Sequence, residues 1–147
     1  AFFDKSITCF EAVASGYFDT MGLYRKLNDR QTAQVDGWLS ALRLTGIRDK
    51  KLAQVAAGQQ RLIILLRAFI KQPPLLILDE PCQGLDQWQS AAFVELVQDY
   101  SRRTAATLIY LASDPARWNN ERLPDFYCGN NEALKDMKRM AEEEGAA

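Results

Sequence analysis

Two adjacent carboxylates, Asp79 and Glu80, follow a short apolar run in the middle of the chain. The run, Leu75 to Leu78, contains only leucine and isoleucine, which is typical of a parallel strand covered on both faces. Side chains at the carboxyl end of such a strand emerge where α/β folds bind ligands. Asp79 is therefore a candidate magnesium ligand and Glu80 a candidate proton acceptor for an attacking water, although a strand followed by a solvated Asp-Glu pair would give the same pattern.

Two further segments flank this pair. Gly58 and Gln59 open a predicted helix, whose first amides have no partner within the helix and can face a phosphate, with help from the helix dipole. Gly84-Leu85-Asp86 predicts a turn that places a third carboxylate nearby. Each segment alone also fits a plain helix start or a plain turn, and only their order and spacing make the combination specific.

A phosphate-cradling loop of the form G-x-x-x-x-G-K-[ST] requires a Gly-Lys dipeptide. No Gly-Lys dipeptide occurs in this sequence. The residues that would cradle a nucleotide's phosphates are therefore not among these 147 residues.

The run from Val55 to Asp86 resembles the ATP-binding cassette of ABC ATPases, and the likeness extends over roughly Ile7 to Tyr127. More narrowly, the chain resembles the tandem-cassette ATP-binding proteins of the molybdenum-transport type, also described as photorepair-like. Five segments carry this narrower likeness: Ser15-Gly16-Tyr17-Phe18-Asp19, Asp29-Arg30-Gln31, Trp38-Leu39, Gly58-Gln59-Gln60-Arg61-Leu62 and Gly84-Leu85-Asp86.

The resemblance implies an α/β fold, a partial P-loop NTPase of the RecA-like kind. Residues 1–70 would form the helical subdomain that carries the signature, and residues 71–147 the second half of the parallel-sheet core. The P-loop, the Q-loop and the aromatic residue that stacks on adenine would lie upstream. The chain would then be the later part of a cassette, inactive by itself.

The resemblance also implies the site residues. Asp79 would hold the metal, and Glu80 and Ser113 would stand at catalytic positions. Signature and D-loop residues would contact the nucleotide of an opposing cassette; they are Ala56, Ala57, Gly58, Gln59 and Asp86.

Two positions depart from the family pattern. The signature serine, whose hydroxyl would donate to the γ-phosphate, is Ala56 here, a loss of about 1–3 kcal/mol. The histidine that follows the second core strand is Ser113, and losing an acid-base group of this kind costs on the order of 10²–10⁴ in rate. These substitutions fall in opposite sites of a cassette dimer, so we expect nucleotide binding with slow hydrolysis.

The implied cofactors are ATP and Mg²⁺, and the implied partner is a second cassette, as a homodimer or in tandem. Two roles remain open for the whole protein: an ATPase subunit that drives a membrane permease, or a non-transport cassette that acts as a nucleotide-gated regulatory or nucleic-acid-associated clamp. We do not expect this chain to contact nucleic acid, because its arginines are dispersed among apolar residues and form no basic stripe.

Composition agrees with one ordinary globular domain, with 48% hydrophobic and 25% charged residues and a net charge of −1. The longest apolar stretch, Leu62 to Ile70, is interrupted by Arg67 and is shorter than the ~20 residues of a membrane span. Three cysteines without any histidine argue against zinc sites and for reduced thiols. We therefore expect a soluble, cytoplasmic chain, peripheral at the inner membrane if it serves a permease.

Hydrophobic periodicity and turn residues predict the elements that position these side chains. Asn28, with Gln31 at the spacing of a capping box, predicts the start of one helix. The helix from Gly58 is apolar on nearly every face, so we expect it to be buried between layers and to end before Pro73-Pro74. A right-handed β-α-β unit is expected to follow it. The expected helices span residues 6–15, 28–46, 58–71, 87–102, 115–119 and 131–144, the expected strands span residues 75–78, 107–112 and 126–128, and a turn-rich loop covers residues 16–22.

Overall fold

The computed structural model describes residues 6–19, 25–111 and 126–129. The chain forms two compact units. The first consists of Ala1–Pro73 with Gly84–Leu96, and the second of Pro74–Gln83 with Val97–Ala147. Helix α4 (Gln87–Arg103) therefore begins in the first unit and ends in the second.

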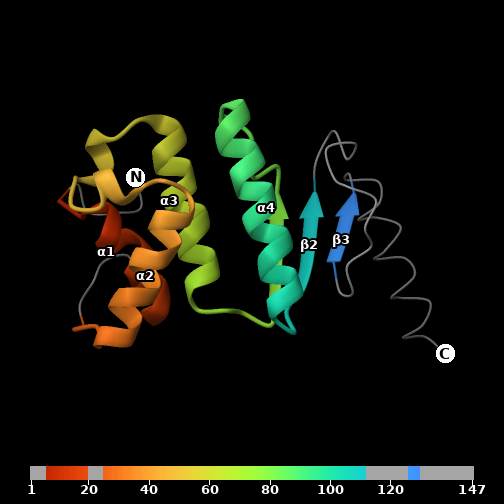
Figure 1. Cartoon of the computed structure of the whole chain (residues 1–147), viewed down its shortest axis with the longest axis horizontal. Helices are drawn as coiled ribbons and strands as arrows, with labels where there is room; N and C mark the ends of the chain where they lie inside the picture. The colour runs from red at the N-terminus through yellow and green to blue at the C-terminus, as the bar shows by residue number, and fades with distance from the viewer. Residues whose placement is uncertain (1–5, 20–24, 112–125, 130–147) are drawn as a thin grey trace. The chain divides into compact units, whose positions relative to one another are not determined.

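The first unit is helical, and Figure 1 shows α1, α2 and α3 gathered together. Helix α1 packs mainly against α3, with α2 beside both. Its elements, in chain order before α4, are α1 (Cys9–Ala14), η1 (Ser15–Phe18), α2 (Asp29–Ala41), η2 (Thr45–Ile47), η3 (Leu52–Gln54) and α3 (Ala57–Ile70).

Side-chain caps decide where the first two long helices begin. Asn28 accepts from the amide of Gln31 at 2.8 Å, and the Gln31 side chain accepts from the amide of Asn28 at 3.1 Å, which confirms the predicted capping box. Thr8 and Glu11 make the same reciprocal pair before α1. Because Thr8 occupies the cap, α1 starts at Cys9, later than the predicted start near Ser6.

Helix α2 ends earlier than predicted. We expected it to run to about Gly46, but Arg43 adopts a left-handed conformation with a φ of 54°. The amide of Leu44 then donates to the carbonyl of Leu39 at 2.8 Å and that of Arg43 to Ser40 at 3.0 Å, the pattern of a Schellman stop. Glycine usually takes this conformation, so an arginine at this position does not indicate the end of a helix.

The core of the first unit is built around α3. Phe69 is fully buried, with its ring centroid 5.8 Å from that of Trp38 and 6.0 Å from that of Phe93, the latter edge to face. Cys9 is also fully buried, and this burial raises the pKa of its thiol above the ordinary value. The packing thus joins α2, α3 and the first part of α4 in one apolar cluster.

The prediction that α3 is buried on nearly every face was wrong. Ile64 is 46% exposed, and it shares a face with the half-buried Arg61 and the exposed Lys71. These positions recur at helical spacing and form one stripe toward solvent, whereas Leu62, Leu66 and Phe69 point inward. The sequence did not indicate this exposed stripe, because Ile64 is apolar.

The predicted turn-rich loop after α1 is the 3₁₀ helix η1 over its described part, Ser15–Phe18. Gly16 lies directly against α3 there, since a Cβ on it would stand 2.4 Å from the carbonyl oxygen of Arg67. Ser15 is fully buried and accepts from the Arg67 guanidinium at 3.1 Å. The small residues at 15 and 16 therefore permit the close approach of η1 to α3.

The second unit holds a parallel sheet of three strands in the order β1-β2-β3 (Figure 1). The strands are β1 (Leu75–Asp79), β2 (Thr107–Leu111) and β3 (Phe126–Gly129). Leu78 pairs with Tyr110 and Asp79 with Leu111, while Tyr110 pairs with Cys128. The predicted strands and their parallel direction are confirmed.

The prediction that β1 is covered on both faces was wrong. Its exposure alternates: Leu76 and Leu78 are 9% and 5% exposed, whereas Leu75 and Ile77 are 52% and 55% exposed. Successive side chains of a strand point to opposite faces, so only one face of β1 is covered by the described residues. The predicted helices at residues 115–119 and 131–144 lie outside the described residues.

Candidate functional site

The carboxylate pair lies where β1 ends. Asp79 is the last residue of the strand and is exposed, and Glu80, half-buried, begins the turn that follows. Glu80 has a φ of 45°, a conformation uncommon for residues other than glycine. Its amide donates to the carbonyl of Leu111 at 2.8 Å, and its carbonyl accepts from Gln83 at 3.1 Å. One backbone bond to β2 and one within the turn therefore hold the strained residue in place.

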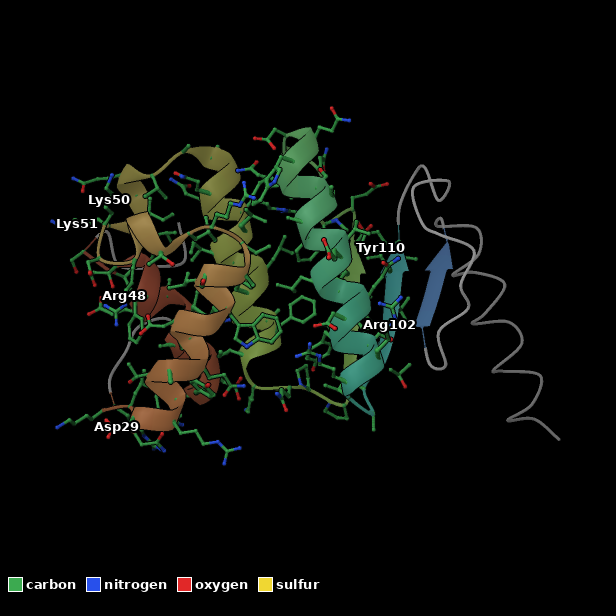
Figure 2. The ribbon with its side chains drawn as sticks, in the orientation of Figure 1. Asp29, Arg48, Lys50, Lys51, Arg102 and Tyr110 are labelled. Carbon is green, nitrogen blue, oxygen red and sulfur yellow. The ribbon has the colours of Figure 1, made fainter. Side chains whose placement is uncertain are left out.

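A side-chain contact fixes the same turn from its other end. The Cys82 sulfur lies 3.1 Å from the hydroxyl of Tyr110. Tyr110 is on β2 (Figure 2). Pro81, between Glu80 and Cys82, is buried. Contacts on both sides of Pro81 thus hold the turn to β2. They fix the backbone from which the Glu80 side chain extends.

The start of α3 is capped on one side only. Ala56 is the N-cap, and its amide donates to the Gln59 side chain at 3.1 Å. The opposite half of a capping box needs a side-chain oxygen at residue 56, which alanine lacks. The amides of Ala57, Gly58 and Gln59 have no partner within the helix, and Ala56 and Ala57 are exposed.

We expect Ala56→Ser to stabilise the fold by about 0.5–2 kcal/mol, because the hydroxyl would complete the capping box with Gln59. Urea unfolding of the two proteins measures the difference. The matched control is Ala57→Ser, one residue further on, where the side chain stands inside the first turn and cannot cap it. Equal or greater stabilisation by Ala57→Ser would contradict the assignment of Ala56 as the cap.

Asp86 begins α4 through a capping box that sequence reasoning missed. The amide of Gln89 donates to an Asp86 carboxylate oxygen at 2.7 Å, and the Asp86 amide donates to the Gln89 side-chain oxygen at 3.1 Å. The signal was present, since an acceptor followed three residues later by glutamine is the spacing of such a box. Asp86 itself is exposed.

The structure brings some of the predicted site residues together. The start of α3 and Asp86 belong to the first unit, where Gly58 lies beside the Gln89 side chain. Asp79 and Glu80 belong to the second unit. Ser113 lies outside the described residues.

The donor set fits magnesium better than a closed protein cage. Among residues 6–19, 25–111 and 126–129, no three histidine, cysteine or acidic side chains gather as a metal site. Magnesium is commonly bound by one or two carboxylates together with waters and substrate phosphates. The exposed Asp79 can supply such a carboxylate.

No helix in the described part of the chain is long and apolar enough to cross a membrane.

Comparison with known proteins decides the family. The sequence profile described as "ABC transporter" matches residues 2–83, more than half of the chain. The chain belongs to the ABC transporter family. This ABC chain is 48% identical over 86 residues to the ABC transporter ATP-binding protein ModF of Escherichia coli K12, a match that covers 55% of the chain and 17% of ModF.

A zinc uptake system ATP-binding protein, ZurA of Listeria monocytogenes, is 34% identical over 107 residues, which are 73% of the ABC chain and 42% of ZurA. The ABC chain therefore spans less than half the length of these relatives.

Solved structures agree on the fold. An ATP-binding cassette of an ABC transporter in its ADP conformation superposes with a TM-score of 0.55 at 21% identity, over 72% of the ABC chain and 45% of that protein. A nucleotide-free cassette gives a TM-score of 0.57 at 19% identity, over 74% and 47%. The expected α/β fold, a partial P-loop NTPase, is confirmed.

Proposed function

We propose that this chain is part of the ATP-binding protein of an ABC transporter, which couples ATP binding and hydrolysis to transport. The observation that carries the proposal is the end of β1. There, an exposed aspartate is followed by a glutamate in a left-handed conformation, whose amide is bonded to the neighbouring parallel strand. Family membership supports a magnesium-binding role for this aspartate, because P-loop NTPases place a magnesium-holding aspartate in this position.

Asp79 and Glu80 have different roles in the proposal. Asp79 holds Mg²⁺, usually through water, and the ion neutralises charge that develops on the phosphates. Glu80 accepts a proton from the attacking water or orients that water toward the γ-phosphate. The backbone of Glu80 is bonded to Leu111, so the point from which its side chain extends is fixed relative to β2.

The first-unit residues serve the opposite nucleotide site of a cassette pair. The uncapped amides at Ala57, Gly58 and Gln59 face the phosphates of ATP bound by a second cassette, and the positive end of the α3 dipole favours that anion. Asp86 lies at the same interface. The second cassette and a membrane permease are the partners of this proposal, at the cytoplasmic face of the membrane.

The 147 residues need a phosphate-binding loop that their sequence does not supply. We use "complete cassette" for this sequence joined to such a loop. Gel filtration with and without Mg-ATP, together with a phosphate-release assay, tests the proposal on the complete cassette. ATP-dependent dimerisation with measurable turnover is expected, and a complete cassette that neither binds Mg-ATP nor pairs would refute it.

Hydrolysis by the complete cassette should be slow, because Ser113 replaces an imidazole and Ala56 a hydroxyl. We expect Ser113→His to raise kcat at least about tenfold, a change of about 1.4 kcal/mol in barrier. Ser40→His, at the exposed end of α2, is the control and should leave kcat unchanged. Rapid steady-state turnover with Ser113 in place, or no response to histidine, would remove this part of the proposal.

A further inference from the structure

Gly58 lies against the side chain of Gln89. A Cβ built on Gly58 would stand 2.7 Å from the side-chain oxygen of Gln89 and 3.2 Å from its nitrogen. Real side chains do not approach a Cβ this closely, so the amide of Gln89 occupies the space that a side chain at residue 58 would need. Glycine at this position is therefore a requirement of the Gln89 conformation.

The same Gln89 oxygen has a second task. It accepts from the amide of Asp86 at 3.1 Å, while the backbone amide of Gln89 donates to the Asp86 carboxylate at 2.7 Å. Any shift of the Gln89 side chain away from Gly58 moves the acceptor of the Asp86 amide. One oxygen atom thus connects the first turn of α3 with the N-cap of α4.

A neighbouring contact holds the first turn of α4 from another direction. The Arg43 guanidinium lies 4.6 Å from the ring centroid of Trp88, within the range of a cation–π interaction. Arg43 is the left-handed residue that ends α2. Residues 84–96 accordingly belong to the same compact unit as α2 and α3.

We propose that Gln89 is a positioning residue that sets the orientation of Asp86 according to the state of the α3 N-terminus. The proposal rests on the assignment of Gly58 and Asp86 to the nucleotide interface. A phosphate that engages the amides beside Gly58 would act on the Gln89 side chain, and through its oxygen on the backbone amide of Asp86. Signature and D-loop residues of one cassette would then respond together to one nucleotide.

Amide hydrogen exchange, followed by NMR on the 147-residue chain, tests the connection. Loss of the side-chain acceptor in Gln89→Ala should speed exchange of the Asp86 amide about 2- to 10-fold, the range for one net hydrogen bond. Gly58→Ala should give the same effect by displacing Gln89, and Gln89→Glu, which keeps an acceptor oxygen, should retain the slow exchange. The double variant Gly58→Ala/Gln89→Ala should exchange no faster than Gln89→Ala.

Two controls separate this linkage from general loosening. Gly37→Ala introduces the same methyl group in α2, where nothing lies within 4 Å of the new carbon, and should not alter exchange at Asp86. Gln87→Ala changes an exposed glutamine in the same turn as Gln89 and should also have no effect. Unchanged Asp86 exchange in Gly58→Ala, or additive effects in the double variant, would overturn the proposal. The assay uses no nucleotide, so its outcome stands even if the complete cassette fails to bind ATP.

Discussion

Glu80→Gln is expected to lower kcat for ATP hydrolysis by the complete cassette about 10²–10⁴-fold, while Mg-ATP binding stays close to that of the parent. Glutamine keeps the size of the side chain and one acceptor oxygen but cannot accept the proton of the attacking water. The backbone turn at Glu80 is made by main-chain groups, so the substitution leaves it intact. Phosphate release under saturating ATP measures kcat, and fluorescent-nucleotide titration measures binding.

Glu95→Gln is the matched control. Glu95 is exposed on α4, and its substitution removes the same charge without touching the end of β1. The expected kcat is that of the parent. If Glu80→Gln and Glu95→Gln behaved alike, Glu80 would not be the group that activates water.

Phe69→Ala is expected to destabilise the fold by about 3–5 kcal/mol, the usual range for a fully buried aromatic side chain. Phe69 has no exposed surface and contacts the rings of Trp38 and Phe93. Its removal leaves a cavity in the cluster that joins three helices of the first unit. Guanidinium unfolding of the 147-residue chain, followed by tryptophan fluorescence, measures the change.

The control lies on the same helix. Ile64 is 46% exposed, so Ile64→Ala should change the free energy of unfolding by no more than about 0.5 kcal/mol, as is usual for surface positions. Similar losses for the two substitutions would show that α3 is buried all round, as its composition first indicated, and would contradict the exposed stripe.

Local chemistry explains what the sequence predicted well. The Asn28–Gln31 box and the short runs that form β1 and β2 depend on neighbours within a few residues, so pattern and propensity were sufficient. The family resemblance supplied the parallel α/β arrangement, and the solved cassettes agree with it.

Tertiary contacts explain what the sequence did not predict. The left-handed turn at Arg43 goes with a contact to Trp88, far away in the chain, and no local pattern marks it. The exposed face of β1 depends on which layers cover the strand, and composition does not report that. The fit between Gly58 and Gln89 is likewise a matter of packing, although the Asp86–Gln89 box could have been found from spacing.

The candidate site is therefore understood in two parts. Asp79 and Glu80 follow a strand, and their placement depends on backbone bonds to β2. The start of α3 and Asp86 are connected through Gln89 within the helical unit. Neither part contains a phosphate-cradling loop, so nucleotide binding is expected only of the complete cassette.

Isothermal titration with Mg-ATP tests this central claim most directly. The 147-residue chain should show no saturable binding in the micromolar range, whereas the complete cassette should bind under the same conditions. That contrast would show that these residues bind Mg-ATP only in a chain that also has a phosphate-binding loop. Micromolar binding of Mg-ATP by the 147-residue chain alone would contradict the account.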